Sequence, residues 1–216
     1  LRRLEYRGYD SAGMALINDE RALQIHKRNG KVKELEAAQA QQPYYGNTGI
    51  AHTRWATHGK PSTENAHPHA SGGRVALVHN GIIENHGALR EELIANGYEM
   101  ASATDTEVIA HLLHSHLQQG ASLMEAMQKT IARLEGAYAL AAIDIESPDT
   151  VVGARKGSPL VVGVGIGESF LASDQMALRQ VTDSFIYLDE GDLVEITPGN
   201  IQICTIDGKA IERPTT

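Results

Sequence analysis

The stretch from residue 52 to residue 107 decides the fold, because three polar clusters in it lie among apolar strands: His52-Thr53-Arg54-Trp55-Ala56-Thr57-His58-Gly59, His79-Asn80-Gly81 and Thr104-Asp105-Thr106-Glu107. Strand-like runs at 48–51 and 75–78 precede the first two clusters, and the third is typical of the N-cap of a helix that begins at 108. Together the clusters offer a cation, an anion and amide donors. This set suits a ligand with a carboxylate, an amine and a reacting carbonyl, such as an α-amino acid amide.

The totals exclude several functional classes. A chain of 216 residues can bury a core without disulfides or metals, and we expect one domain over 1–216. The net charge of -8 and the scattered basic residues argue against a nucleic-acid or anionic-membrane partner. No apolar run approaches the roughly 20 residues of a membrane helix. The single cysteine, Cys204, cannot form an intramolecular disulfide, so we expect a cytoplasmic protein.

Periodicity predicts the elements on both sides of this stretch. The sequence begins like the end of an amphipathic helix, followed by a hairpin at 14–17 and 23–27 and by helices around 32–38 and 89–94. Asn80-Gly81 predicts a hairpin turn between strands at 75–78 and 82–83. The capping boxes Thr104-x-x-Glu107 and Ser122-x-x-Glu125 predict two further helix starts.

The remainder of the chain is predicted to be β-structure. Alternating runs occur at 138–143, 150–154, 160–164, 169–172, 185–188, 193–197 and 201–206, and Asp207-Gly208 indicates a last hairpin. Strands, then helices, then strands predict two antiparallel sheets packed face to face with outer helices.

Each candidate residue also has a purely structural interpretation. Arg54 has the fork geometry to clamp a carboxylate, although a single arginine is more often a surface residue. Asp105 lies at a helix start, where the dipole stabilises a carboxylate without any ligand, so capping is the simpler role. Asn80 and Gly81 offer a side-chain and a backbone N–H to a developing oxyanion, although the same dipeptide is common in turns.

Six of the ten histidines lie in this region, namely His52, His58, His67, His69, His79 and His86. His67-x-His69 raises the alternative of a cupin-like metal-binding β protein. That pattern requires a glutamate a few residues later, where this sequence has Ser71-Gly72-Gly73-Arg74. We therefore expect hydrogen-bonded neutral histidines and no metal site.

The motifs in combination resemble a known family. The segments that carry the resemblance are Tyr6–Gly13, His52–Gly59, Asn65–His69, His79–His86, Thr104–Glu107, Gly157–Leu160 and Ala172–Gln175. In this order they resemble the N-terminal, class II glutamine amidotransferase (glutaminase) domain of glucosamine-6-phosphate synthases. Related glutaminases of the phosphoribosyl-pyrophosphate amidotransferase type differ around Arg54 and Asp105, so the sugar-phosphate branch is preferred.

The resemblance implies an α+β fold of the N-terminal-nucleophile hydrolase type, a four-layer αββα sandwich, with glutamine as substrate and no cofactor. It further implies that Arg54 binds the α-carboxylate of glutamine and that Asp105 binds its α-ammonium. The other implied roles are pocket lining by Trp55, Thr57 and His58, an oxyanion hole made by Asn80 and Gly81, and support from Arg7.

The family's nucleophile is a cysteine at the mature N-terminus, whose own α-amine is the base. Residue 1 here is leucine, and Cys204 lies in a late strand without an adjacent base. We therefore expect residues 1–216 to lack the strand that carries the nucleophile and to be inactive by themselves. In the intact enzyme we expect a C-terminal sugar-phosphate isomerase domain that uses the ammonia, and a homo-oligomer. A non-catalytic amino-acid-binding domain is the alternative.

Overall fold

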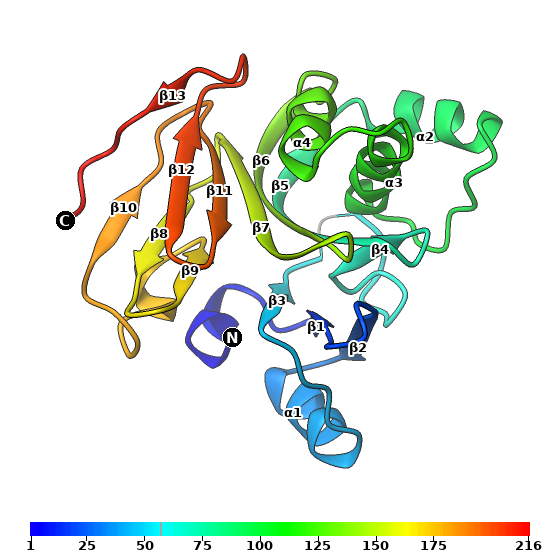
Figure 1. The fold of residues 1–216 in the computed structure, drawn as a ribbon. Coiled ribbons are helices and arrows are strands. Elements are labelled where there is room, and N and C mark those ends of the chain that lie inside the picture. Colours follow the sequence, from blue (N-terminus) through cyan, green and yellow to red (C-terminus); the bar gives the residue numbers. More distant parts are fainter. Residues whose placement is uncertain (57) are drawn as a thin grey trace.

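Long apolar strands form the centre of the molecule. A computed structural model describes residues 1–56 and 58–216, and its largest sheet has seven antiparallel strands in the order β13-β12-β11-β7-β6-β5-β4 (Figure 1). Their bounds are His69–Ser71 (β4), Val75–Ile83 (β5), Gly136–Asp144 (β6), Ser147–Lys156 (β7), Leu193–Thr197 (β11), Asn200–Cys204 (β12) and Ala210–Ile211 (β13). The expectation that Thr57 lines a pocket lies outside the described residues.

Strand alternation gives this sheet two apolar faces. Leu77 and Leu140 point to one face, which packs against α2 (His86–Ala95), α3 (Asp105–Gln118) and α4 (Leu123–Ile131). Ala76 and Ile143 point to the opposite face and join a second apolar cluster. None of the described helices is both long and apolar enough to cross a membrane.

Two smaller sheets cover the second face of the large sheet. One has the order β2-β1-β3, with β1 at Ser11–Ile17, β2 at Leu23–Asn29 and β3 at Thr48–Arg54. The other has the order β10-β8-β9, with β8 at Val161–Val164, β9 at Ser169–Ala172 and β10 at Phe185–Tyr187. Ile50 of β3 packs with Ala76, and Val162 of β8 packs with Val194. The predicted face-to-face packing is therefore confirmed, with the second layer divided into two parts.

The outer layer on this side is thin. Helix α1 (Val32–Gln41) packs on Ala12 through Val32 and Leu35. Two short 3-10 helices, η1 (Arg2–Arg7) and η2 (Gln175–Ala177), lie beside it, so the helix predicted at the start of the sequence is a 3-10 helix here. The complete arrangement is the expected four-layer αββα sandwich.

A cavity of about 360 Å³ separates the two parts of the divided layer. Within the described residues, β3 pairs only with β1, and β9 pairs only with β8, so each strand turns an unpaired edge to this space. Residues 49–53 and 169–173 form its walls, and Val78 and Ala141 of the large sheet lie at its floor. An open edge on both sides makes the cavity suited to an extended segment.

The hairpin predicted at Asn80-Gly81 is wrong. Strand β5 continues through both residues and pairs with β6, so that Gly81 faces Tyr138 and Ile83 faces Gly136. Gly81 has a φ of 136°, and a Cβ at this position would lie 2.0 Å from the carbonyl oxygen of Ala137. Glycine is therefore required by a close backbone contact inside the sheet and not by a turn.

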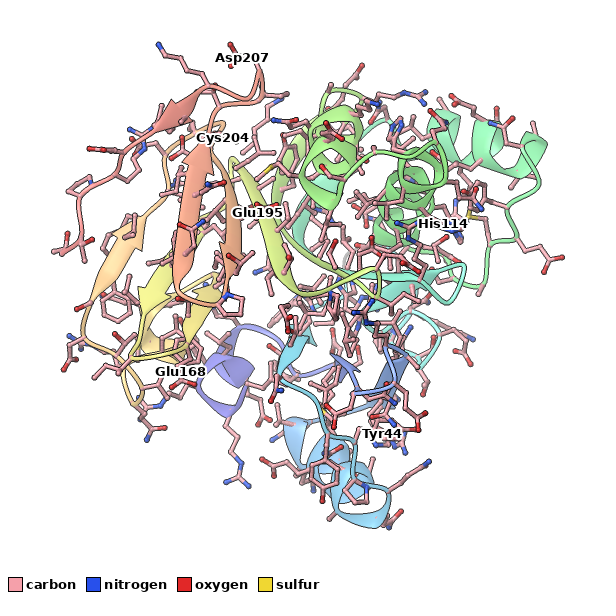
Figure 2. The ribbon with its side chains drawn as sticks, viewed as in Figure 1. Tyr44, His114, Glu168, Glu195, Cys204 and Asp207 are labelled. Atoms are coloured by element: carbon pink, nitrogen blue, oxygen red, sulfur yellow. The ribbon has the colours of Figure 1, made fainter. Side chains whose placement is uncertain are left out.

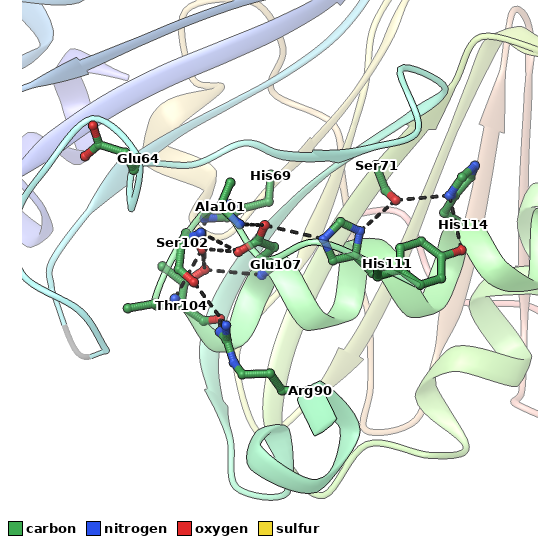
Figure 3. Close-up of polar contacts among 12 residues, drawn as sticks. Glu64, His69, Ser71, Arg90, Ala101, Ser102, Thr104, Glu107, His111 and His114 are labelled. Atoms are coloured by element: carbon green, nitrogen blue, oxygen red, sulfur yellow. Dashed lines mark hydrogen bonds and ion pairs between the residues drawn. The ribbon is translucent and has the colours of Figure 1, made fainter. Parts of the chain in front are cut away.

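The two capping boxes differ. At α4 both reciprocal bonds between Ser122 and Glu125 are present, as predicted. At α3 the side chain of Thr104 accepts a hydrogen bond from the backbone N–H of Glu107, but the Glu107 carboxylate accepts from the N–H groups of Ala101 and Ser102 (Figure 3). The helix consequently begins at Asp105, three residues before the predicted start, and the 101–104 segment is fastened to its first turn.

Candidate functional site

A pocket of about 240 Å³ lies where β3 meets the end of β5 and the start of α3. Its lining includes six of the residues singled out from the sequence: Arg7, Arg54, Trp55, Asn80, Gly81 and Asp105. Residues Arg7, His52, Thr53, His79 and Asn80 line both this pocket and the cavity between β3 and β9, so the two spaces adjoin. The structure thus brings together clusters that are far apart in the sequence.

Arg54 ends β3 and is 4% exposed. Its guanidinium donates to the carbonyl oxygens of His58, Gly59 and Lys60, which holds this segment against the pocket. Burial lowers the pKa of Arg54, while the negative charge of Asp10 opposes the change. The surface interpretation of Arg54 is therefore wrong. Its contacts with the 58–60 carbonyls are a role that the sequence did not indicate.

Asp105 is the first residue of α3, and the cap of this helix is Thr104. Capping is therefore not the role of Asp105. Its Oδ2 atom accepts a hydrogen bond from the backbone N–H of Ile83 at 2.9 Å, and its Oδ1 atom lies 4.0 Å from Nδ1 of His58. Asp105 is 4% exposed and lines the pocket at the N-terminal end of α3.

Asn80 and Gly81 lie side by side on β5 at the pocket wall. The Oδ1 atom of Asn80 accepts a hydrogen bond from Nε2 of His52 at 2.7 Å. Among the described residues, none accepts a hydrogen bond from the Nδ2 group of Asn80. This amide therefore offers its N–H donors to a ligand.

Three histidines behind Asn80 were not assigned a role from the sequence. His52, His67 and His79 line the pocket, and the rings of His52 and His67 stack with centroids 4.1 Å apart. Burial lowers the pKa of His52 to about 4 and also lowers the pKa values of His67 and His79. All three are neutral at physiological pH, so the part of the pocket wall that these histidines form is polar but uncharged. The only sequence feature that could have indicated a role for these three histidines is their crowding within the 52–79 stretch.

The remaining predicted residues lie at the rim. Trp55 is 58% exposed, and its ring makes an edge-to-face contact with Tyr9 at 5.4 Å. His58 does not line the pocket itself, although its ring reaches the Asp105 carboxylate as described above. Arg7 donates a hydrogen bond to Oγ of Ser173 at 2.9 Å. Arg7 therefore ties the first segment of the chain to the end of β9.

Cys204 lies on β12, away from the pocket (Figure 2). It packs against the apolar cluster beneath the helices, and burial raises the pKa of its thiol. It lines neither the pocket nor the adjoining cavity. A half-buried thiol with a raised pKa is a poor nucleophile, and its distance from the pocket leaves Cys204 no part in chemistry at this site.

A second polar cluster lies beside α3 (Figure 3). Oγ of Ser71 is 2.8 Å from Nδ1 of His111, and Nε2 of His111 is 3.4 Å from the Glu107 carboxylate. This order of groups is that of a hydrolytic triad, but Ser71 is 3% exposed and lines neither cavity, so a substrate cannot reach it. In the part of the chain that the structure describes, no group of three or more potential ligands is arranged to hold a metal ion.

Comparison with known proteins gives consistent matches. The sequence profile of a family described as a glutamine amidotransferase domain matches residues 52–180. The chain is 58% identical over 213 residues to an isomerizing glutamine–fructose-6-phosphate aminotransferase of Pseudomonas syringae, and 56% identical over 214 residues to one of Yersinia pestis. Each match covers 99% of this chain and 35% of the relative, so the chain spans about a third of their length.

Solved structures have the same fold. A glutamine phosphoribosylpyrophosphate amidotransferase from B. subtilis superimposes with a TM-score of 0.78 at 25% identity, over 94% of this chain and 44% of that one. A glutamine aminotransferase class-II domain protein from Silicibacter pomeroyi gives a TM-score of 0.65 at 18% identity, over 91% of both chains.

Proposed function

Because the chain belongs to the glutamine amidotransferase domain family, we propose that its pocket binds glutamine and forms the site where the side-chain amide is hydrolysed to ammonia. The observation that carries this proposal is the convergence of Arg54, Asp105 and the Asn80-Gly81 pair on one pocket of about 240 Å³. A cation, an anion and two amide donors match the three polar groups of glutamine.

The two charged side chains bind the two charged groups on the α-carbon of glutamine. Arg54 binds the α-carboxylate, because its planar fork pairs two oxygens at once. To do so, its contacts with the 58–60 carbonyls are exchanged for contacts with the ligand. Asp105 binds the α-ammonium through Oδ1, since Oδ2 is already held by Ile83. Trp55 borders the bound amino acid, and His58 lies beside the Asp105 carboxylate.

The amide end of glutamine lies against β5. A thiolate attacks the carboxamide carbon, and the electron pair of the C=O bond moves to its oxygen. Asn80 Nδ2 and the Gly81 backbone N–H donate to this oxyanion, which lowers the barrier because the donors are already in place. The nitrogen leaves as ammonia after taking a proton. Water then cleaves the thioester, which releases glutamate and restores the thiol.

The nucleophile is proposed to be a cysteine at the head of an N-terminal strand, with its own α-amine as the base. This strand occupies the cavity between β3 and β9. Two features support this placement, namely the unpaired edges of both strands and the continuity of the cavity with the pocket. Residues 1–216 alone then bind glutamine but release no ammonia from it.

The ammonia is used by the remainder of a longer enzyme. The similarity to isomerizing glutamine–fructose-6-phosphate aminotransferases supports fructose 6-phosphate as the acceptor and glucosamine 6-phosphate as the product, formed in a C-terminal sugar-phosphate isomerase domain of a homo-oligomer. Glutamate and ammonia release by the intact protein, measured with and without fructose 6-phosphate, tests the function. Glutamine binding without hydrolysis would instead identify an amino-acid-binding domain.

A further inference from the structure

The orientation of the Asn80 side chain decides whether it can stabilise an oxyanion. An asparagine amide has a donor end and an acceptor end, and a rotation of half a turn about χ2 exchanges them. Only the donor end can stabilise negative charge on a substrate oxygen. A contact that fixes this rotation therefore contributes to the reaction through the donor.

We propose that His52 is a positioning residue, which holds Oδ1 of Asn80 toward β3 and so leaves Nδ2 directed at the reacting carbonyl; this inference rests on the proposed function. The contact is the 2.7 Å hydrogen bond from His52 Nε2 to Asn80 Oδ1, which joins β3 of the divided layer to β5 of the large sheet. His52 itself donates nothing to the substrate.

The hydrogen-bonding pattern favours this orientation over the reverse. Nδ1 of His52 is buried and has no partner within residues 1–56 and 58–216. If the Asn80 amide were reversed, Nε2 would become the acceptor and the ring proton would move to Nδ1. That tautomer would place the N–H on Nδ1, which has no hydrogen bond of good geometry among the described residues, although the backbone of His79 lies near the ring and acts to raise its pKa. The proton therefore stays on Nε2, which requires Oδ1 of Asn80 opposite it.

A chain of hydrogen bonds holds the His52 ring in place from behind. His52 stacks on His67 with an interplanar angle of 17°. Nε2 of His67 donates to Oγ1 of Thr106, whose hydroxyl donates to Nδ1 of His79, and Nε2 of His79 donates to the carbonyl oxygen of Ala137. Every donor in this series of hydrogen bonds points toward the carbonyl oxygen of Ala137. The tautomers of the two supporting rings are therefore fixed by a backbone carbonyl that cannot act as a donor.

The test is a double-mutant cycle in the intact enzyme. His52→Phe keeps a ring to stack on His67 but removes the donor, and it should lower kcat for glutamate release about 10- to 100-fold with KM changed less than about twofold. In an Asn80→Ala background the same substitution should change kcat by less than about twofold, because there is no amide left to orient.

Two polar variants form a matched pair for the same test. His52→Gln places an amide N–H near the former Nε2 position and should recover most of kcat, whereas the shorter His52→Asn should not. Melting temperature and glutamine binding are measured on each variant, so that kcat is compared per folded molecule. If His52→Phe does not fold, the Gln and Asn pair decides the question.

Three outcomes would overturn the proposal. One is an additive cycle, in which His52→Phe lowers kcat equally with and without Asn80. Another is an unchanged kcat in folded His52→Phe while Asn80→Ala is strongly impaired, which removes the positioning role but keeps the oxyanion hole. The third is an unchanged kcat in Asn80→Ala, or no glutamine hydrolysis by the unmodified enzyme, which rejects the proposed function together with this inference.

Discussion

The carboxylate of Asp105 accepts a hydrogen bond from the backbone N–H of Ile83 at 2.9 Å, and this contact joins the start of α3 to the end of β5. The charge that is proposed to bind the substrate ammonium is thereby held in fixed register with the proposed oxyanion hole, two residues back along β5 at Gly81. Strand β5 thus sets the position of both ends of glutamine: the α-ammonium through Asp105 and the carboxamide through Gly81. Preorganised groups of this kind avoid the cost of reorientation during the reaction.

Asp105→Asn should weaken glutamine binding by about 1 to 3 kcal/mol, because it removes the charge opposite the ammonium. The asparagine Oδ1 can still accept from Ile83, so the melting temperature should change little. Steady-state kinetics of the intact enzyme with glutamine, beside a thermal melt, measures both effects. A wild-type kcat/KM in this variant would remove Asp105 from the substrate site.

Arg54→Lys should weaken glutamine binding by a similar amount, about 1 to 3 kcal/mol, since lysine keeps the charge but loses the fork. It also loses the hydrogen bonds to the 58–60 carbonyls, so proteolysis of this segment should become faster. A suitable control is Arg2→Lys, which alters an exposed ion pair with Glu36 away from the pocket. Equal kcat/KM values in Arg54→Lys and in the control would contradict the assignment.

Acidification should destabilise the fold below about pH 6.5. Burial lowers the pKa of His52 to about 4 and that of His69 to about 3. Between these values and the ordinary pKa of about 6.5 the unfolded chain binds protons that the folded chain does not. The free energy of unfolding should therefore fall as the pH falls, by up to about 1.4 kcal/mol per pH unit for each histidine, and the full contribution is present above pH 6.5.

Urea denaturation at pH 7.5 and pH 5 measures this dependence. His69→Gln retains a polar group for Thr104 but cannot titrate, so its free energy of unfolding should vary less with pH than that of the wild type. A stability that is constant from pH 7.5 to pH 5 would show that these histidines are not buried in the neutral form.

Cys204→Ser should leave glutamine hydrolysis by the intact enzyme unchanged, because the thiol packs under the helices and lines neither cavity. Replacement of the proposed N-terminal cysteine by serine should instead abolish most of the activity. Both variants can be assayed together for ammonia and glutamate. Loss of activity in Cys204→Ser with an unchanged melting temperature would contradict the proposed nucleophile.

The sequence predicted the β-strands well because alternation is a local signal that burial on one face imposes. Each run predicted after Gly136, from 138–143 to 201–206, corresponds to a strand of the structure. Asn80-Gly81 was misassigned for the same reason. The turn signal is local, whereas the pairing of Gly81 with Tyr138 depends on β6, which follows only after three helices.

The candidate site was only partly predictable. The motifs named residues that do line one pocket, including Arg54, Asp105 and Asn80. The contact between His52 and Asn80 was not foreseen, since it crosses between two sheets that no sequence pattern places in register. The loop contacts of Arg54 were missed because backbone carbonyls leave no trace in the sequence.

The most direct test of the central claim is kcat for glutamate release by the intact Asn80→Ala enzyme. The account predicts a decrease of about 10²- to 10³-fold with little change in the KM for glutamine, because this donor acts mainly in the transition state. The melting temperature, measured beside turnover, separates this from a folding defect. A folded Asn80→Ala enzyme with wild-type kcat would contradict the claim that the pocket at Asn80 and Gly81 is the site of glutamine hydrolysis.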